Sequence, residues 1–213
     1  MNVETINPYV IKIIIAARAK DSIRAISRRI GLSYAWTYKW VHALADEGVF
    51  KIQKRLTVNK KNNFYKSTIA YINEVLAKEV SFFYKVLPLF GITYCFTLTD
   101  AVFVWTKGGY NIARYKRWYP VFIRVRSKDK KIFEAYCETL GLPTEKRRGV
   151  FYVAGFADDF EISFVDGVPA DSLEQTVAFM QVNIYNFQPA MEMIAELYHI
   201  KNKTAYREQA TNV

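Results

Sequence analysis

The chain has 213 residues, of which 51% are apolar and 16% aromatic, so it can bury a sizeable core and is not a disordered tail. This length allows one large domain or two small ones. The two cysteines, Cys95 and Cys137, are too few for a disulfide framework and lack a metal-binding spacing. The opening residues MNVETINPYV do not form a signal peptide, and no apolar run approaches the ~20 residues that span a bilayer. We therefore expect a cytoplasmic protein with no membrane segment.

The net charge of +10 is unevenly distributed along the chain. Residues 1–66 carry 13 basic and 4 acidic side chains, whereas residues 149–213 carry 3 basic and 9 acidic ones. A second basic block, residues 101–148, carries 12 basic and 4 acidic side chains. Basic residues concentrated in a short N-terminal block are typical of a polyanion-binding surface, and a phosphate backbone is the commonest partner of such a surface.

Three helices and a hairpin are predicted in the first block. Asn7 and Pro8 are typical of a helix start, which predicts a helix over 7–19. Isoleucines at helical spacing predict a second helix over 22–30, ended by Gly31. A third helix over 33–46 begins at its N-cap Ser33 and turns Thr37, Val41 and Leu44 inward. The stretches VFKIQKRLTV and FYKST then predict two strands on either side of the basic tip NKKNN.

This order of elements is that of a winged helix-turn-helix. The stretch SIRAISRRIGLSYAWTYKWVHALADEGVF resembles the bacterial and archaeal winged-helix transcription regulators, in the turn Gly31-Leu32-Ser33 and in the separation of Leu44 from Gly48. The resemblance implies a DNA-binding domain over residues 1–66 and a homodimer that matches a two-fold operator. The expected function is sequence-specific binding of double-stranded DNA as a transcription regulator.

The resemblance also indicates which residues contact DNA. The third helix (33–46) lies in the major groove in this motif, the second helix crosses the backbone, and the basic wing 51–66 lies on the backbone. Lysine can bond a guanine edge or a phosphate, and tyrosine can donate to phosphate or pack on a thymine methyl group. The predicted contacts are Arg24, Arg28, Ser33, Tyr34, Ala35, Trp36, Tyr38, Lys39, His42, Lys54, Arg55, Lys60, Lys61 and Asn62. Alternatively, Trp36 and Trp40 are partly core residues and His42 is an ordinary exposed helix residue. Any one of the basic residues could likewise be an ordinary solvent-exposed side chain that does not contact DNA.

Residues 67–90 are predicted to form a linker helix. Apolar residues recur there at spacings of three and four, which is the pattern of an amphipathic helix. They are Ile69, Ile72, Leu76, Val80, Phe83 and Leu87. Such a helix either packs on one of the two domains or pairs two copies of the chain into a dimer.

The remaining residues, 91–213, alternate between strand and helix patterns. Strands are expected over 92–98, 119–125, 149–156 and 159–165, with a turn at Asp166-Gly167. Helices are expected over 100–108, 127–141 and 171–181, and again from residue 190 after a break at Asn186, Gln188 and Pro189. This order predicts a small mixed sheet with helices on one or both faces. The chain as a whole is therefore expected to be α+β.

Two segments of this domain are similar to the minimal nucleotidyltransferase domains of toxin–antitoxin and abortive-infection proteins. They are the strand, short helix and strand over 92–125, and FVDGVPADSLEQTVAFM at 164–180. Those enzymes hold phosphates with a Gly-Ser pair and Mg²⁺ with an Asp-x-Asp pair. Here Leu98-Thr99-Asp100 stands at the first position and Tyr119 to Ile123 at the second. The resemblance therefore implies a non-catalytic domain without metal or cofactor, used for assembly with a protein partner or for sensing a small effector.

The second basic block has two interpretations. It either faces the acidic region 158–174 of the same or a neighbouring chain, or makes a second nucleic-acid contact through Arg114, Lys116 and Arg117. Two alternatives to a transcription regulator also stay open. One is an antitoxin-like or assembly protein whose winged helix binds a protein partner, and the other is a nucleic-acid-modifying enzyme with an unrecognised site. With His42 and His199 as its two histidines, the chain has little material for a Ser-His-Asp arrangement.

Overall fold

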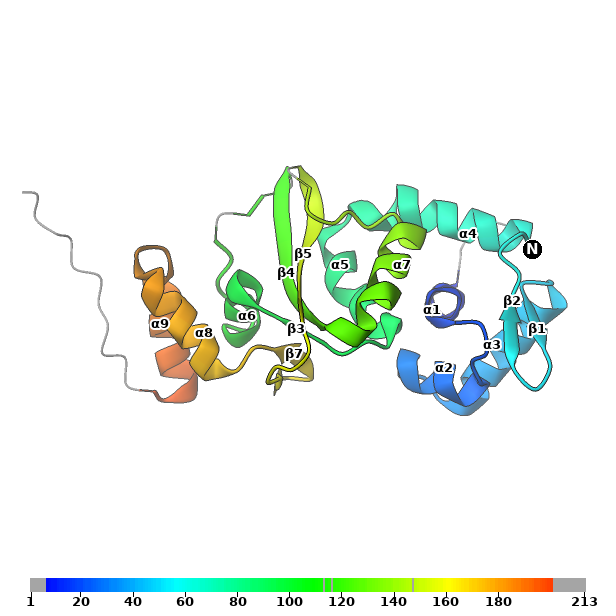
Figure 1. Ribbon diagram of the computed structural model, residues 1–213, viewed down its shortest axis with the longest axis horizontal. Helices are drawn as coiled ribbons and strands as arrows, with labels where there is room; N and C mark the ends of the chain where they lie inside the picture. The colour runs from blue at the N-terminus through cyan, green and yellow to red at the C-terminus, as the bar shows by residue number, and fades with distance from the viewer. Residues whose placement is uncertain (1–6, 113, 116, 147, 201–213) are drawn as a thin grey trace, which may run out of the picture. The chain divides into compact units, whose positions relative to one another are not determined.

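The structure is a computed structural model that describes residues 7–200 except 113, 116 and 147. It is α+β and divides into two compact units (Figure 1). Unit 1 comprises Met1–Ile92 and Lys131–Pro143, and unit 2 comprises Thr93–Lys130 and Thr144–Val213. Lys131–Pro143 falls within the sequence range predicted for the second domain, yet its contacts place it in unit 1. Within the described ranges no helix is long and apolar enough to cross a membrane.

Unit 1 opens with three helices whose ends follow their local capping signals. They are α1 (Pro8–Ala16), α2 (Ile23–Ile30) and α3 (Tyr34–Asp46). The side chain of Ser22 accepts a hydrogen bond from the backbone of Ala25 at the start of α2, and Gly31 ends that helix with a φ of 65°. The first helix ends at Ala16 rather than at the predicted residue 19, because Ala17 is already in an extended conformation.

Apolar side chains from these helices form the core of unit 1. Ile13, Ile26 and Val41, one from each helix, are completely buried, and Leu44 of α3 is 3% exposed. Burying an aliphatic side chain of this size contributes roughly 1.5–3 kcal/mol each. The inward stripe predicted for the third helix is therefore confirmed, and the opposite side of α3 faces solvent.

A short antiparallel hairpin follows, formed by β1 (Phe50–Ile52) and β2 (Leu56–Val58), with Phe50 paired to Val58. The prediction placed the tip at 59–63 and a strand over FYKST, and both were wrong. The tip is at 53–55, and FYKST lies in α4 (Asn63–Glu74). The reason is local: the side chain of Asn62 accepts a hydrogen bond from the backbone of Tyr65 at 3.1 Å and caps α4.

The single linker helix predicted over 67–90 is wrong as well. The segment consists of α4, a 3-10 turn at Leu76–Lys78, α5 (Val80–Val86) and a second 3-10 turn at Leu87–Phe90. Extended backbone at Glu79 separates the first turn from α5. Ile72 and Phe83, from the two halves, are both completely buried, so the apolar pattern is satisfied by packing without a continuous helix. Unit 1 also contains most of α7 (Lys130–Leu140).

Unit 2 is built on a mixed five-stranded sheet, which confirms the predicted sheet type. The strand order is β5-β4-β3-β7-β6. Neighbours β4 and β5, and β3 and β7, are parallel, whereas β3 and β4, and β6 and β7, are antiparallel. The strands are β3 (Tyr94–Phe96), β4 (Trp118–Arg126), β5 (Gly149–Ala157), β6 (Ser163–Val165) and β7 (Val168–Ala170). Strand β7 was not predicted, since its three residues follow a turn and contain Pro169.

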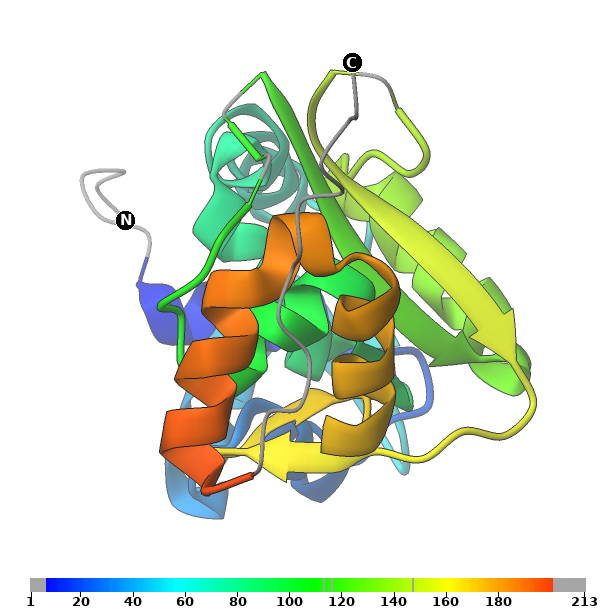
Figure 2. The same ribbon diagram turned by 90° about the vertical axis from the view of Figure 1, so that its left-hand side faces the viewer.

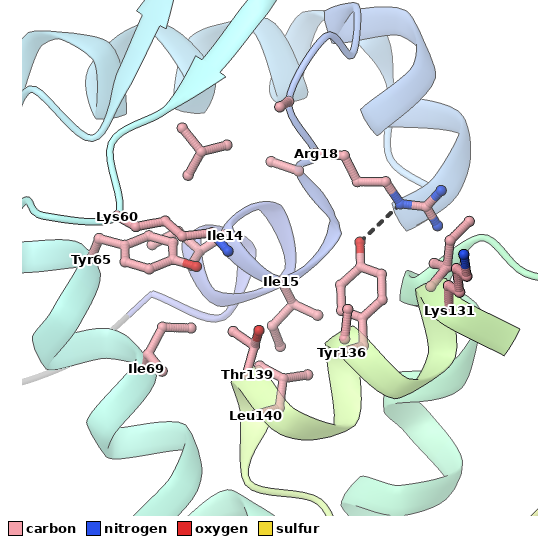
Figure 3. A pocket seen from close by; sticks show the side chains of 15 residues that line it. Ile14, Ile15, Arg18, Lys60, Tyr65, Ile69, Lys131, Tyr136, Thr139 and Leu140 are labelled. Atoms are coloured by element: carbon pink, nitrogen blue, oxygen red, sulfur yellow. Dashed lines mark hydrogen bonds between the residues drawn. The ribbon is translucent and has the colours of Figure 1, made fainter. Parts of the chain in front are cut away.

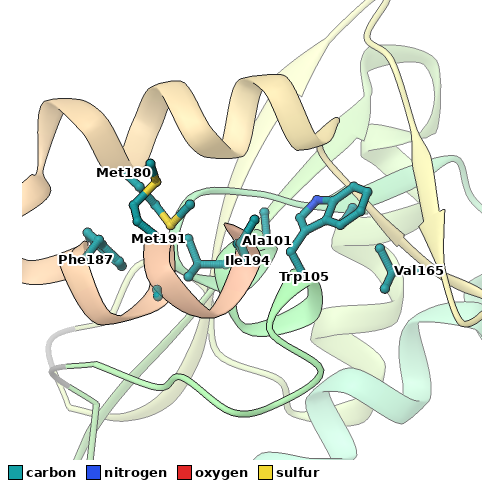
Figure 4. Close-up of a cluster of buried hydrophobic side chains, with 10 residues drawn as sticks. Ala101, Trp105, Val165, Met180, Phe187, Met191 and Ile194 are labelled. Carbon is teal, nitrogen blue, oxygen red and sulfur yellow. The ribbon is translucent and has the colours of Figure 1, made fainter. Parts of the chain in front are cut away.

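Three helices of unit 2 share one apolar cluster. They are α6 (Leu98–Trp105), α8 (Leu173–Val182) and α9 (Ile184–Tyr198). Helices α8 and α9 lie side by side in Figure 2, and Figure 4 shows Met180 of α8 beside Met191 of α9, with Ile194 and Ala101 between them and Trp105 of α6. The predicted break at Pro189 is wrong, because α9 continues through it. Pro189 removes one backbone donor, and the burial of Phe187 and Met191 on either side offsets that loss.

Candidate nucleic-acid interface

Helix α3 presents an aromatic face to solvent. Its N-terminus is fixed by Ser33, whose hydroxyl accepts a hydrogen bond from the backbone of Trp36 at 3.3 Å. With the inward stripe buried, the outward face exposes 49% of Tyr34, 51% of Trp36 and 45% of Tyr38. Ala35 and Lys39 on the same helix are also exposed. Large aromatic side chains that stay this exposed are available to a binding partner.

Ring contacts hold this aromatic face in a defined arrangement. The Lys39 ammonium lies 5.2 Å from the ring centre of Trp36 and 5.7 Å from that of Trp40. Tyr38 lies between its helical neighbours, with ring centres 6.0 Å from Tyr34 and 4.1 Å from His42. His42 is half-buried under Tyr38, and Trp40 is half-buried with its indole N–H shielded from solvent and no acceptor among the described residues. Trp40 is therefore a partly core residue, whereas Trp36 is a surface residue.

A polar cleft of about 330 Å³ lies beside the start of α3. It is lined by the first turn of α2, by Tyr34 and by the hairpin tip. Three predicted contact residues from these separate elements, Arg24, Lys54 and Arg55, meet there. Arg24 also lies 5.9 Å from the ring centre of Tyr34. Cations gathered beside the N-terminus of a helix favour an anion such as a phosphate.

One carboxylate also lines this cleft, but its charge is compensated. Asp21 accepts a hydrogen bond from Arg29 at 2.7 Å, and each side chain is 13% exposed. Arg29 also donates to the carbonyl of Ala16, so it ties α2 to the end of α1. Arg29 is therefore a structural residue, while Arg24 and Arg28 of the same helix are exposed.

Three residues of the predicted wing lie away from its tip. Lys60 and Lys61 are exposed in the turn that follows β2, because the tip is at 53–55. Asn62 is half-buried; besides capping α4, its amide donates to the carbonyl of Glu47 at 2.9 Å. Asn62 thus fixes the turn between the hairpin and α4.

Among the described residues, four cations of the second basic block form ion pairs within unit 2. Arg114 was predicted as a nucleic-acid contact, but its side chain is 1% exposed and lies 2.7 Å from Asp100, which is completely buried. Lys116 lies outside the described residues, and Arg117 is exposed. Other ion pairs join the block to the acidic region 158–174, as in the first interpretation of its charge. These pairs are Lys107–Asp166, Arg124–Asp171 and Arg126–Asp159.

The carboxylates near the expected nucleotidyltransferase positions are committed to such pairs. Asp171, which follows β7, accepts hydrogen bonds from Thr97 and from the thiol of Cys95, the latter at 3.3 Å. Burial, followed by the adjacent Asp171 carboxylate, raises the pKa of the Cys95 thiol. Asp100 accepts from Arg114 and, at 2.7 Å, from the backbone of Phe122. Across the described ranges, no three His, Cys, Asp or Glu side chains gather as a metal ion would require.

Comparisons of the chain with protein-family models, curated proteins and solved structures gave no match. The function therefore has to be inferred from the geometry. Among the features described above, the buried pair Asp100–Arg114 was not anticipated, because the two residues lie in different elements, 14 residues apart in the sequence. An acidic residue in the first turn of an apolar helix, as Asp100 is in α6, is the one local signal that could have indicated a buried role.

Proposed function

We propose that residues 1–66 form a winged helix-turn-helix that binds double-stranded DNA, and that the protein is a transcription regulator. The observation that carries this proposal is the polar cleft, where Arg24, Lys54 and Arg55 meet beside the exposed start of α3. Two elements that are separate in sequence, α2 and the hairpin tip, thus supply cations to one surface beside α3. A helix flanked in this way can enter the major groove while the flanking cations contact phosphates.

Each part of this surface has a distinct chemical role in the proposal. Tyr34, Tyr38 and Lys39 on the outward face of α3 would contact base edges, thymine methyl groups and nearby phosphates. The cations of the polar cleft would contact the backbone without regard to sequence. Lys39 is already held over two indole rings, so less side-chain freedom is lost on binding.

The exposed aromatic side chains support a second candidate, a protein-docking surface. Tyr34, Trp36 and Tyr38 are each about half exposed, and aromatic residues are enriched at protein–protein contacts. The two candidates differ in their dependence on salt. DNA binding weakens steeply with salt because counterions are released from the phosphates, whereas docking through aromatic side chains does not.

We also propose that the regulator is a homodimer paired through α4. Tyr71 of α4 is 38% exposed and Val75, the C-cap residue that follows this helix, is 46% exposed, while Ile72 is buried. Two-fold pairing would match the symmetry of typical operators. Light scattering of the full chain should give twice the monomer mass, and Tyr71→Glu with Val75→Glu should give the monomer mass. A monomer mass for the unmodified chain would exclude the dimer.

Footprinting on the DNA upstream of the protein's own gene tests the function. We expect a protected site that Tyr38→Ala and Lys39→Ala each weaken by roughly ten- to hundredfold, the effect of removing one interaction with a base edge. Lys85→Ala is the matched control, since Lys85 is an exposed lysine of α5 outside the polar cleft and α3. If no upstream fragment is protected, or if neither α3 variant weakens protection, the proposed recognition helix is wrong.

A further inference from the structure

Unit 1 contains a second, mainly apolar pocket of about 380 Å³. It is formed by the end of α1, the residues around the end of β2, α4 and α7, all of which belong to unit 1 (Figure 3). Ile14 and Ile15 are each 3% exposed and Leu140 is 1% exposed, and these side chains contribute to its wall. A volume of this size is within the roughly 300–1,000 Å³ that small-molecule sites occupy.

Close packing is the norm inside proteins, so an apolar space of this size needs an explanation. Its wall atoms lack dispersion partners on the open side, and a ligand with an apolar body would supply them. Figure 3 shows Lys60 and Tyr65 on one side of the space, Arg18, Tyr136 and Lys131 on the opposite side, and Ile15, Ile69 and Leu140 between them. The apolar wall therefore fits a hydrocarbon or aromatic body.

The charged side chains that line the pocket are all positive. Its lining includes Arg18, Lys60 and Lys131 and no carboxylate. Within the part of the chain that the structure describes, neither lysine forms an ion pair. Three cations without a counter-charge beside an apolar wall favour a ligand with a negative group at one end of an apolar body.

Two tyrosines fix the polar end of this pocket. Tyr136 stacks on Phe90 with ring centres 4.4 Å apart and donates its hydroxyl hydrogen to the carbonyl of Ala16. The same hydroxyl accepts from Arg18 Nε at 3.2 Å, and the Arg18 guanidinium also donates to the carbonyl of Gly91 at 3.4 Å. Burial, followed by the nearby Tyr136, raises the pKa of Tyr65, so its hydroxyl keeps its proton as a hydrogen-bond donor at neutral pH.

We propose that this pocket binds a small organic acid, a single carboxylate on an aliphatic or aromatic body. The carboxylate lies beside Lys60 and the body lies against Ile15, Ile69 and Leu140, while Arg18 and Lys131 add positive charge on the opposite side of the pocket (Figure 3). A polyphosphate does not suit the apolar wall, and a neutral apolar compound leaves the three cations uncompensated. The polar cleft beside α3 shares no residue with this pocket, although Lys60 is also among the DNA contacts predicted from the sequence.

Calorimetric titration of the full chain with octanoate and with 2-naphthoate tests the proposal, with octanamide and 2-naphthamide as uncharged controls of the same shape. We expect at least one acid to bind about tenfold or more tightly than its amide, the factor supplied by one charge-assisted hydrogen bond. Lys60→Gln should lower the affinity for that acid severalfold, Lys131→Gln should lower it less because Lys131 stands on the opposite side of the pocket, and Lys85→Gln should leave it unchanged. These positions are exposed, so the variants should fold normally.

Ala135→Trp provides a second test, because Ala135 lines the pocket and is itself exposed, so an indole there fills space without crowding the core. This variant should abolish acid binding while its thermal unfolding stays unchanged. Absence of binding by both acids would overturn the proposal, as would equal affinities for acid and amide. Footprinting is a separate readout, so the DNA proposal and this one can fail independently.

Discussion

Replacing Asp100 by Asn should destabilise unit 2 strongly, because the substitution leaves the Arg114 guanidinium buried without its counter-charge. The two side chains are 0% and 1% exposed, and their nitrogen and oxygen atoms lie 2.7 Å apart. The second Asp100 oxygen accepts from the backbone of Phe122, so the carboxylate also holds α6 on β4. Removing one partner of a buried pair costs about 3–5 kcal/mol, and we expect about 3 kcal/mol here because asparagine keeps the shape and one acceptor.

Urea unfolding measures this loss in a Trp36→Phe, Trp40→Phe background, where the remaining tryptophans, Trp105 and Trp118, both report on unit 2. With a slope of about 2 kcal/mol per molar urea, the Asp100→Asn midpoint should fall by about 1.5 M. The double variant Asp100→Leu, Arg114→Met should recover most of the loss, because it removes both charges together.

Arg117→Ala is the matched control for Arg114→Met, since Arg117 is exposed in the same basic block. It should leave the urea midpoint unchanged, whereas Arg114→Met should lower it. An Asp100→Asn midpoint equal to that of the unmodified chain would refute the reasoning, because the pair would then contribute nothing to folding. A double variant as unstable as the single one would refute it as well.

Three further predictions follow from local features of the two units. Burial, and then the neighbouring Glu134, raise the pKa of Cys137 from 9.0 to about 12. The unfolded chain therefore loses this proton at a lower pH than the folded chain does. The free energy of unfolding should fall by about 1.4 kcal/mol per pH unit as the pH rises from 9 towards 12. Urea unfolding at several pH values should show a weaker fall in Cys137→Ala, and an equally steep fall in that variant would contradict the prediction. Leu98 begins α6 with a φ of 51° and is 39% exposed. Leu98→Gly should relieve about 1 kcal/mol of backbone strain and keep or raise the melting temperature, whereas Leu98→Val should lower it. Ser33→Ala removes the cap of α3 and should cost about 1 kcal/mol in urea unfolding, with Ser67→Ala, an exposed serine within α4, as the neutral control.

Elements with strong local signals could be predicted from the sequence. Helices α2 and α3 lie close to their predicted positions, because Ser22, Gly31 and Ser33 act through backbone groups only a few residues away. The hairpin tip was misplaced because Asn62 can shape a turn or cap a helix, and the sequence pattern does not distinguish the two roles. In the structure it caps α4.

Features that depend on contacts between distant residues could not be predicted. The segment of α7 that lines the apolar pocket belongs to unit 1, although its sequence lies between two strands of unit 2. Arg114 lies in a strongly basic stretch of the sequence, where a surface position is expected. Its burial depends on Asp100, which is 14 residues away. The cations of the polar cleft could be predicted from the order of elements in the winged helix-turn-helix motif. Their position beside Tyr34 could not, because it depends on how the hairpin packs against the helices.

The salt dependence of DNA affinity tests the central claim most directly. Fluorescence anisotropy with a protected upstream duplex should show affinity that falls linearly with the logarithm of salt concentration. Lys54→Ala with Arg55→Ala should reduce that slope by about 0.9 for each phosphate that the variant no longer neutralises, while Lys85→Ala should not change it. An unchanged slope in the Lys54, Arg55 variant would contradict the proposed DNA surface, as would affinity that does not depend on salt in the unmodified chain.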